Sequence, residues 1–189
     1  VGVVLAGLVA VAGRTLRDRA AALRGELLGS TATIIARQLS RDVYEATYLA
    51  APRAGASAPL LVGCIGLADH GGGPVHAVTG AASGTYSLFA YCLDDARQLW
   101  HLRDDAAPVG PIPALPPCGT GRWTPLAARP LSVRGDLEPA DPKAAFRSPR
   151  WSGSVEVALL LGLGPTTTQG ALAAPVRLSL RSQAALRAP

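Results

Sequence analysis

The sequence predicts an α+β fold in which one long N-terminal helix packs against an antiparallel β-sheet with long loops rich in proline and glycine. Residues 1–50 contain no proline, although the chain has 16, and are rich in alanine, leucine and arginine, which lose little side-chain freedom in a helix. Beyond Pro52, short alternating apolar segments are separated by stretches rich in proline and glycine, which is typical of antiparallel strands joined by loops.

The length of the predicted helix decides the domain organisation. A helix over residues 1–50 would extend about 75 Å at ~1.5 Å per residue, whereas a compact globule of 189 residues has a diameter of about 40 Å. The helix is therefore expected to project into a membrane, a partner or an assembly. We divide the chain into this helix and a globular β-rich head domain over residues 51–189.

Residues 1–13 form an uncharged run at the start of the helix. At ~1.5 Å per residue they cover only about 20 Å of a hydrocarbon layer about 30 Å thick. Three interpretations stay open: a membrane-spanning helix that lacks its first residues, the apolar region of a signal peptide, or a buried helix of the domain. We assign the run to packing in a membrane or filament core through Val3, Val4, Leu5, Leu8, Val9 and Val11.

Residues 14–50 continue the helix with an amphipathic pattern. Apolar residues follow two overlapping rows at three- and four-residue spacing, which predicts one stripe that drifts around the helix and packs on the sheet. Gly25, Gly29 and Ser30 predict a bend or local melting, because glycine costs about 1 kcal/mol relative to alanine in a helix. The first row is Leu16, Ala20, Leu23, Leu27 and Ile34, and the second is Leu28, Ala32, Ile35, Leu39, Val43, Ala46 and Leu49.

The segments after Pro52 predict an antiparallel sheet. Residues 85–93 and 98–103 lie on either side of the turn DDAR and predict a hairpin. Residues 106–130 and 136–154 are rich in proline and are expected to be loops. Further strands are expected at 60–67, 155–162 and 175–180, with a short one near 130–133 and a turn over 164–174.

Charge and motif content argue against two classes of function. The net charge is +5, but Lys143 is the only lysine and the arginines are scattered, so we expect no nucleic-acid partner, although a role in DNA uptake stays open. No residue stands out as a nucleophile beside a base. The glycine-rich stretches match neither a phosphate-binding loop nor a dinucleotide fingerprint. We therefore expect no enzyme activity, no catalytic residues and no cofactor.

Two groups of residues contain side chains that can bind metal ions, but neither has the spacing or the number of ligands of a known metal site. The first, three histidines and a cysteine, matches no helical or knuckle spacing. The second consists of aspartate pairs at the two ends of a predicted strand, but calcium needs six or more oxygens and turns favour aspartate for backbone reasons. We expect no metal site. The groups are His70, His76, His101 and Cys64, and Asp94, Asp95, Asp104 and Asp105.

Three cysteines leave the disulfide pattern open. A bond between Cys92 and Cys118 would close a proline-rich loop and contribute about 3 to 4 kcal/mol in the chain-entropy model. Cys64 with Cys92 is the rival pairing, since both are expected on neighbouring strands, and three buried thiols are the third alternative. We take Cys92 and Cys118 as the candidate disulfide.

Four segments carry a resemblance to a known family. ARQLSRDVYEATYLA ends the helix with an arginine and aspartate pair before an aromatic residue, and LFAYCLDDARQLWHLR forms the predicted hairpin. PLAARPLSVRG supplies a leucine and valine segment, and VEVALLL with RLSLRSQ supplies a closing hairpin. Together they resemble the type IV pilin family, and within it the larger minor pilins and the J-type pseudopilins of type II secretion.

The resemblance implies a pilin-like fold and a structural role in the bacterial cell envelope. The chain would be a subunit of a type IV pilus or type II secretion filament, held in the inner membrane with a periplasmic head and then packed against other pilin or pseudopilin subunits through its N-terminal helix. The family's processing glycine, methylated first residue and nearby glutamate are not found, so we expect roughly ten residues to precede Val1 in the natural protein. The alternative is a secreted or membrane-tethered binding or sensory β-domain with a signal anchor.

Overall fold

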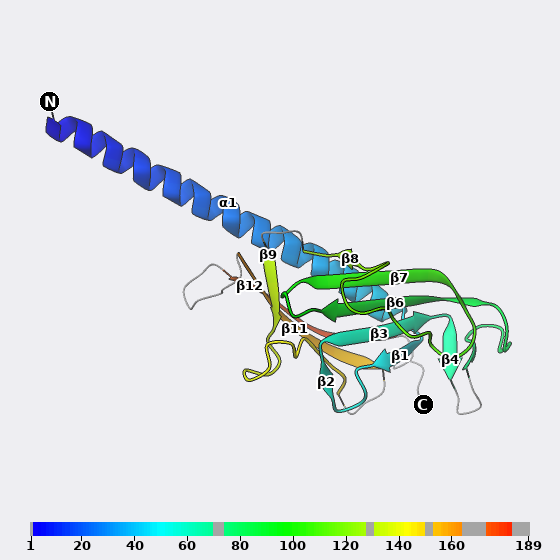
Figure 1. Cartoon of the computed structure of the whole chain (residues 1–189). Coiled ribbons are helices and arrows are strands. Elements are labelled where there is room, and N and C mark those ends of the chain that lie inside the picture. The colour runs from blue at the N-terminus through cyan, green and yellow to red at the C-terminus, as the bar shows by residue number, and fades with distance from the viewer. Residues whose placement is uncertain (1, 70–73, 128–130, 150–152, 164–172, 183–189) are drawn as a thin grey trace.

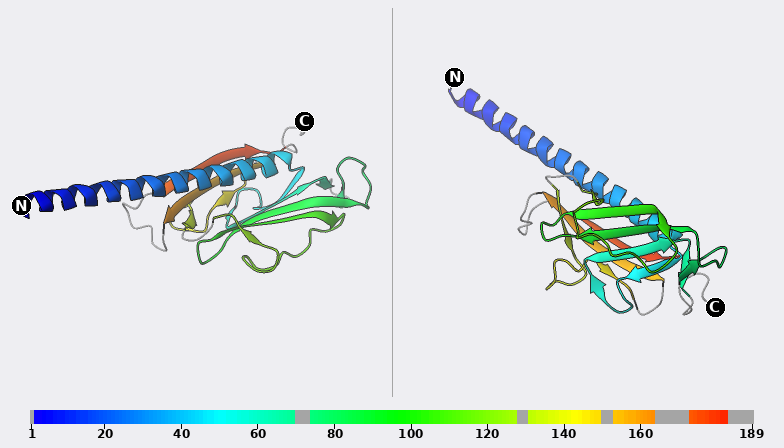
Figure 2. Two further views of the ribbon diagram at one scale, coloured as in Figure 1. Left: turned by 90° about the horizontal axis from the view of Figure 1, so that it is seen from above. Right: turned by 45° about the vertical axis from the view of Figure 1, so that its right-hand side comes forward.

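The structure, a computed structural model, combines one long helix with a β-rich body (Figure 1). Helix α1 (Gly2–Glu45) has 44 residues and is about 66 Å long at ~1.5 Å per residue. Its N-terminal half stands clear of the body, whereas its C-terminal half lies against it (Figure 1 and Figure 2). The structure describes the backbone of residues 2–69, 74–127, 131–149, 153–163 and 173–182, and the side chains of these ranges from residue 14 onward.

The helix ends earlier than predicted. The chain leaves α1 after Glu45, and residues that we expected to be helical form strand β1 (Tyr48–Ala51). Thr47 explains the change, because its backbone N–H donates to the Cys64 carbonyl at 2.8 Å and its hydroxyl donates to the Leu67 carbonyl at 2.7 Å. These hydrogen bonds hold the segment after Glu45 against the edge of a sheet, where it cannot continue the helix. The prediction of helix for this segment is therefore wrong.

The predicted bend or local melting near the middle of α1 is also absent, since the helix continues through Gly25 and Gly29 and runs straight in Figure 1. Both glycines face open space, with no neighbouring atom within 4 Å of the position that a Cβ would occupy. The Thr33 hydroxyl donates to the Gly29 carbonyl at 2.9 Å without interrupting the helix. A propensity cost of about 1 kcal/mol per glycine is too small to break a long helix whose propagation is cooperative.

The body contains two five-stranded sheets and one two-stranded hairpin within the described residues. Its further strands are β2 (Ser57–Ala58), β3 (Leu60–Ile65), β4 (Leu67–Asp69), β5 (Pro74–His76), β6 (Thr85–Leu93), β7 (Leu99–Pro108), β8 (Thr124–Pro125), β9 (Leu131–Gly135), β10 (Phe146–Arg147), β11 (Ser154–Leu163) and β12 (Ala173–Arg181). The first sheet has the order β1-β3-β6-β7-β8, and the second has the order β12-β11-β10-β2. β4 pairs with β5, and all of these pairings are antiparallel.

The single sheet of the predicted pilin-like fold class is wrong, and only the general α+β description holds. A second sheet forms because segments that were expected to be loops contribute strands. β10 and β9 pair in succession along one edge of β11, and β2 pairs with β10. The proline-rich segment after β7 also supplies β8, at the sheet edge where Pro125 needs no backbone donor.

Several individual strands lie where the sequence predicts them. β6 covers the predicted residues, and β11 and β12 each extend slightly beyond theirs. The strand expected over 60–67 is divided at Gly66, whose φ of 88° favours glycine. Most of the turn expected over 164–174 lies outside the described residues.

An inner core lies between α1 and the two sheets. Four side chains of α1 enter it at positions of the second apolar row, and all are at most 2% exposed. Alternate residues of β6 and β11 face the same core, as the two-residue period of a strand requires. Its largest members are Leu28, Ile35, Leu39 and Val43 of α1, Leu61, Phe89, Tyr91 and Leu99 of the first sheet, and Phe146, Leu159 and Leu161 of the second.

An outer core lies on the opposite face of the first sheet, so this sheet is buried on both faces. The proline-rich segment after β7 covers it, and the Trp123 indole N–H donates to the Pro116 carbonyl at 3.1 Å. This segment is irregular but contributes apolar side chains, which the interpretation as a plain loop did not anticipate. The outer core includes Val62, Cys64, Leu88, Ala90, Cys92 and Leu102, covered by Val109, Ile112, Leu115 and Trp123.

We expect Gly135→Ala to destabilise the protein by about 1–3 kcal/mol, the usual cost of overpacking. A Cβ at Gly135 of β9 would lie 2.5 Å from backbone atoms of Ala144, so the backbone itself must move. Gly29→Ala is the matched control, and it should stabilise α1 by about 0.5–1 kcal/mol because nothing obstructs its Cβ. Urea unfolding measures both, and equal stability of the two variants would contradict the packing described for β9.

Candidate functional site

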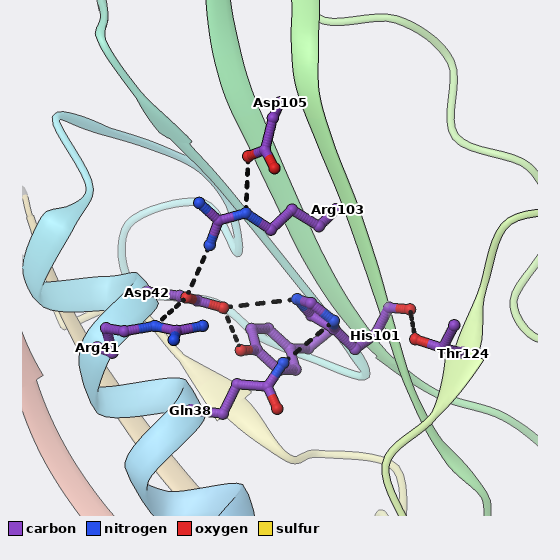
Figure 3. Close-up of polar contacts among 8 residues, drawn as sticks. Gln38, Arg41, Asp42, His101, Arg103, Asp105 and Thr124 are labelled. Carbon is purple, nitrogen blue, oxygen red and sulfur yellow. Dashed lines mark hydrogen bonds and ion pairs between the residues drawn. The ribbon is translucent and has the colours of Figure 1, made fainter.

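A buried carboxylate joins α1 to the first sheet. Asp42 is 0% exposed, and its Oδ2 accepts a hydrogen bond of 2.5 Å from the Tyr91 hydroxyl. His101 Nε2 lies 3.5 Å from the same oxygen. On the other side, Arg41 Nε and Arg103 Nη1 each lie 3.3 Å from Oδ1. We call these five residues the Asp42 cluster (Figure 3).

Gln38 and Asp105 extend the Asp42 cluster on two sides. Gln38 Nε2 lies 3.2 Å from His101 Nδ1. With the amide as donor, Nδ1 is an acceptor, which assigns the ring hydrogen to Nε2 and directs it toward Asp42. Asp105 accepts a hydrogen bond of 2.7 Å from Arg103 Nε, so the guanidinium is held between two carboxylates (Figure 3).

The register between β6 and β7 places Tyr91, His101 and Arg103 of the Asp42 cluster next to one another. Tyr91 of β6 lies directly opposite His101 of β7, and their rings are 4.8 Å apart. Arg103 follows two residues after His101 and therefore shares its face of β7. A slip of one residue between β6 and β7 would turn these side chains away from α1.

The cluster keeps Asp42 ionised. Burial by itself would raise the pKa of Asp42, but hydrogen bonds from His101 and Tyr91 and the charge of Arg41 outweigh burial, so the pKa lies below its ordinary value. Burial, followed by the charge and hydrogen bond of Asp42, raises the pKa of Tyr91. At neutral pH the carboxylate is therefore an acceptor and the phenol is a donor.

The geometry of the cluster suits attachment rather than catalysis. Gln38 contacts Nδ1 of His101 and the Asp42 carboxylate faces Nε2 at 3.5 Å, so among the described residues neither nitrogen is paired with a nucleophile that it could activate. The Asp42 carboxylate is enclosed by its four partners and leaves no side open to a substrate. The cluster holds α1 in one position on β6 and β7.

A second candidate site is the solvent-facing side of α1, which we call the outer face and define by Leu16, Ala20, Leu23, Leu27 and Ile34. Its four larger side chains are between 45% and 67% exposed. At ~100° per residue, the outer face is turned by about 130° around the helix from the buried row that begins at Leu28. The expected single drifting stripe is therefore wrong, because the two rows occupy different sides of α1 and only one packs on the sheets.

The uncharged run at the start of α1 is helical in its backbone. The side chains assigned there to membrane or filament packing lie outside the part that the structure describes. Among the described residues, no helix is both long and apolar enough to cross a membrane. The side chains concerned are those of Val3, Val4, Leu5, Leu8, Val9 and Val11.

The histidines considered as metal ligands are placed apart from one another. His101 belongs to the Asp42 cluster, His76 ends β5, and Cys64 lies in the outer core. His70 lies outside the described residues. Within the ranges that the structure describes, no group of three or more His, Cys, Asp or Glu side chains could hold a metal ion.

The aspartates considered as calcium ligands each have another partner. One accepts a hydrogen bond from an indole, and three form ion pairs with basic side chains. Three of these contacts join neighbouring turns and strands of the head, and the fourth lies within β7. The pairs are Asp94 with Trp100, Asp95 with Lys143, Asp104 with Arg122 and Asp105 with Arg103.

The structure contains a disulfide between Cys92 and Cys118, with their Cα atoms 6.0 Å apart. The rival pairing fails on register, because Cys92 lies opposite Leu60 whereas Cys64 lies opposite Leu88. Four residues along a strand separate them by about 13 Å, too far for a disulfide. Cys64 is a buried free thiol, and burial raises its pKa to about 12.

No protein-family model, curated protein or solved structure matches the chain.

The sequence interpretation missed the Asp42 cluster, although one signal was present. Asp42 follows Leu39 by three residues and directly precedes Val43, so it lies beside the row of α1 that becomes buried together with Ala46. A carboxylate in such a row needs a buried partner, since an unpaired charge would be expensive. The identity of its partners depends on pairing across 49 or more residues of chain, which spacing does not show.

We expect Asp42→Asn to lower the free energy of unfolding by about 2–4 kcal/mol, because Arg103 and His101 lose the charge that they face. The matched control is Asp18→Asn, which removes the same charge from an exposed position of α1. The control should change stability by less than about 0.5 kcal/mol. Denaturant unfolding at pH 7 decides the matter, and equal effects of the two variants would contradict the attachment role.

The depressed pKa of Asp42 also sets a pH dependence. Its folded-state pKa lies below the unfolded value of 3.8, so its contribution is complete above that value and is lost as the pH falls through the folded-state pKa. The stability gap between the parent protein and Asp42→Asn should therefore narrow on acidification from pH 5 toward pH 2. A gap that stays constant or widens would show that Asp42 is not the ionised acceptor described above.

Proposed function

We propose that the chain is a non-catalytic structural subunit of a filament of the type IV pilus or type II secretion kind, and that it packs against neighbouring subunits through α1. The observation that supports this most is the projecting half of α1 (Figure 2), which carries Leu16 and Leu23 of the exposed outer face. A row of exposed leucines on a projecting helix is covered only when another molecule lies against it. The proposal concerns assembly and does not include a pilin-like head.

Burial of the outer face would supply a substantial driving force. Full burial of one leucine or isoleucine side chain contributes about 1.5–3 kcal/mol. The row repeats at alternating three- and four-residue intervals, which is the spacing that lets helices pack side by side at a small crossing angle. Equivalent helices in a filament would meet both requirements.

The Asp42 cluster supports the same proposal from the head side. A subunit in a filament transmits force between its helix and its head, so the junction must be rigid. Burial of Leu28, Ile35, Leu39 and Val43, together with the Asp42 contacts, fixes the docked half of α1 at several points along its length. The projecting half then keeps a defined direction relative to the head.

The proposal places the chain in the bacterial cell envelope, with a periplasmic head. Before assembly, the uncharged run of α1 would lie in the inner membrane, as the resemblance implies. In the filament, the same run would continue the outer face toward the axis of the assembly. Its partners would be other pilin or pseudopilin subunits.

We expect the double variant Leu23→Asp and Leu27→Asp to reduce the filament-associated fraction of the chain at least tenfold, because two apolar contacts of about 1.5 kcal/mol or more would each be lost. Val78→Asp is the matched control, since Val78 is an aliphatic residue of the head that is 86% exposed. The variants would be produced in the natural host, and the chain would be quantified in sedimented filaments. Equal assembly of all three proteins would overturn the proposal.

Cross-linking separates this role from that of a tethered binding domain. A photo-reactive amino acid at position 23 should give adducts with other subunits in the producing cell, whereas the same group at position 78 should give few. Mass spectrometry would identify the adducts. Adducts with lipid alone at position 23 would favour a membrane-tethered binding or sensory domain.

A further inference from the structure

A groove of about 550 Å³ runs between the last turns of α1 and strand β12. The two elements pack against each other, and the left view of Figure 2 shows them side by side. The helix contributes Ser40, Arg41 and Tyr44 to the lining, and β12 contributes three consecutive residues. These three residues are Ser179, Leu180 and Arg181.

The consecutive residues show that the groove follows the edge of β12. Successive side chains of a strand point to opposite faces, so a groove on one face would be lined by every second residue. β12 ends the second sheet and pairs only with β11 in the described part of the chain. An edge of this kind offers backbone donors and acceptors to a further strand.

The groove is basic. The Arg41 side chain is 59% exposed and contacts Asp42 through Nε. Arg181 is exposed, and no carboxylate of the described residues pairs with it. Tyr44 is 58% exposed at the end of the groove. Arginine and tyrosine are the side chains that most often anchor protein interfaces.

We propose that this groove binds an extended acidic segment of a partner protein, which adds to the free edge of β12 and places carboxylates on Arg41 and Arg181. Backbone pairing with β12 accounts for the extended conformation, and the two guanidiniums account for the acidic side chains. Tyr44 covers an apolar side chain of the segment. This inference stands apart from the filament role, because it concerns the head-proximal end of α1 and not the outer face.

Charge argues that the partner is not a second copy of the chain. The net charge is +5, so two copies repel each other at long range. Several carboxylates that the head could offer already form ion pairs within it. These are Asp95, Asp104, Asp105 and Asp136.

The experiment selects peptides from a random twelve-residue display library on the immobilised full chain. The library is first depleted on the double variant Arg41→Gln and Arg181→Gln. We expect the retained peptides to be enriched in aspartate and glutamate, and to bind with an affinity that falls as salt rises from 50 to 200 mM. Failure to enrich acidic peptides, or equal retention on the double variant, would overturn the proposal.

The best peptide is then measured by fluorescence anisotropy against single variants. Arg181→Gln should weaken binding about tenfold or more, the loss of one charged hydrogen bond, and it leaves Asp42 untouched. Arg24→Gln is the matched control, because it removes the same charge from α1 outside the groove, and it should leave the affinity within twofold. Unchanged binding by Arg181→Gln, with an unchanged melting temperature, contradicts the site.

Phosphatidylglycerol vesicles test the rival in which the arginines meet a membrane surface. Vesicle binding that depends on Arg41 and Arg181 without any peptide binding would replace the proposal with a lipid contact. Peptide binding that survives in the assembly-defective variant of the outer face would show that the groove acts independently of the filament. Loss of peptide binding in that variant would contradict the independence claimed here.

Discussion

The carboxylate of Asp42 is the interaction on which the arrangement of helix and head depends. Its two oxygens contact the sheet through Tyr91, His101 and Arg103, and it sits among the apolar residues that attach α1 to both sheets. Apolar packing alone is tolerant of small shifts, whereas a buried charge is stable only with its partners in place. The carboxylate therefore gives the helix a defined register and rotation on the sheet.

That fixed rotation divides the helix into surfaces with different tasks. The buried row begins at Leu28, and the earlier turns of α1 leave the side chains of Leu16 and Leu23 each 67% exposed among the described residues. The same rotation places Arg41 and Tyr44 beside the edge of β12. The projecting half of α1, which we propose for assembly, and the groove beside β12 thus both follow from one docking geometry.

The sequence correctly predicted the helix and strands whose hydrophobic periodicity extends over many consecutive residues. The helix, β6, β11 and β12 were predicted because their periods extend over many residues. The second sheet was missed, since β2 and β10 have two residues each and carry no readable period. The end of α1 and the partners of Asp42 were missed because both are set by contacts distant in the chain, with Thr47 held by the residues around Cys64.

Amide hydrogen exchange along α1 of the unassembled chain tests whether Asp42 and the buried row fix one half of the helix on the head, because it reports the stability of each turn separately. We expect weak protection over residues 14–27 and a steep rise after Leu28, with the amides from Ile35 to Val43 exchanging only at the rate of global unfolding. Uniform protection along the helix would show that the first half also packs on the body. Weak protection around Asp42 would show that the junction is not the rigid attachment described.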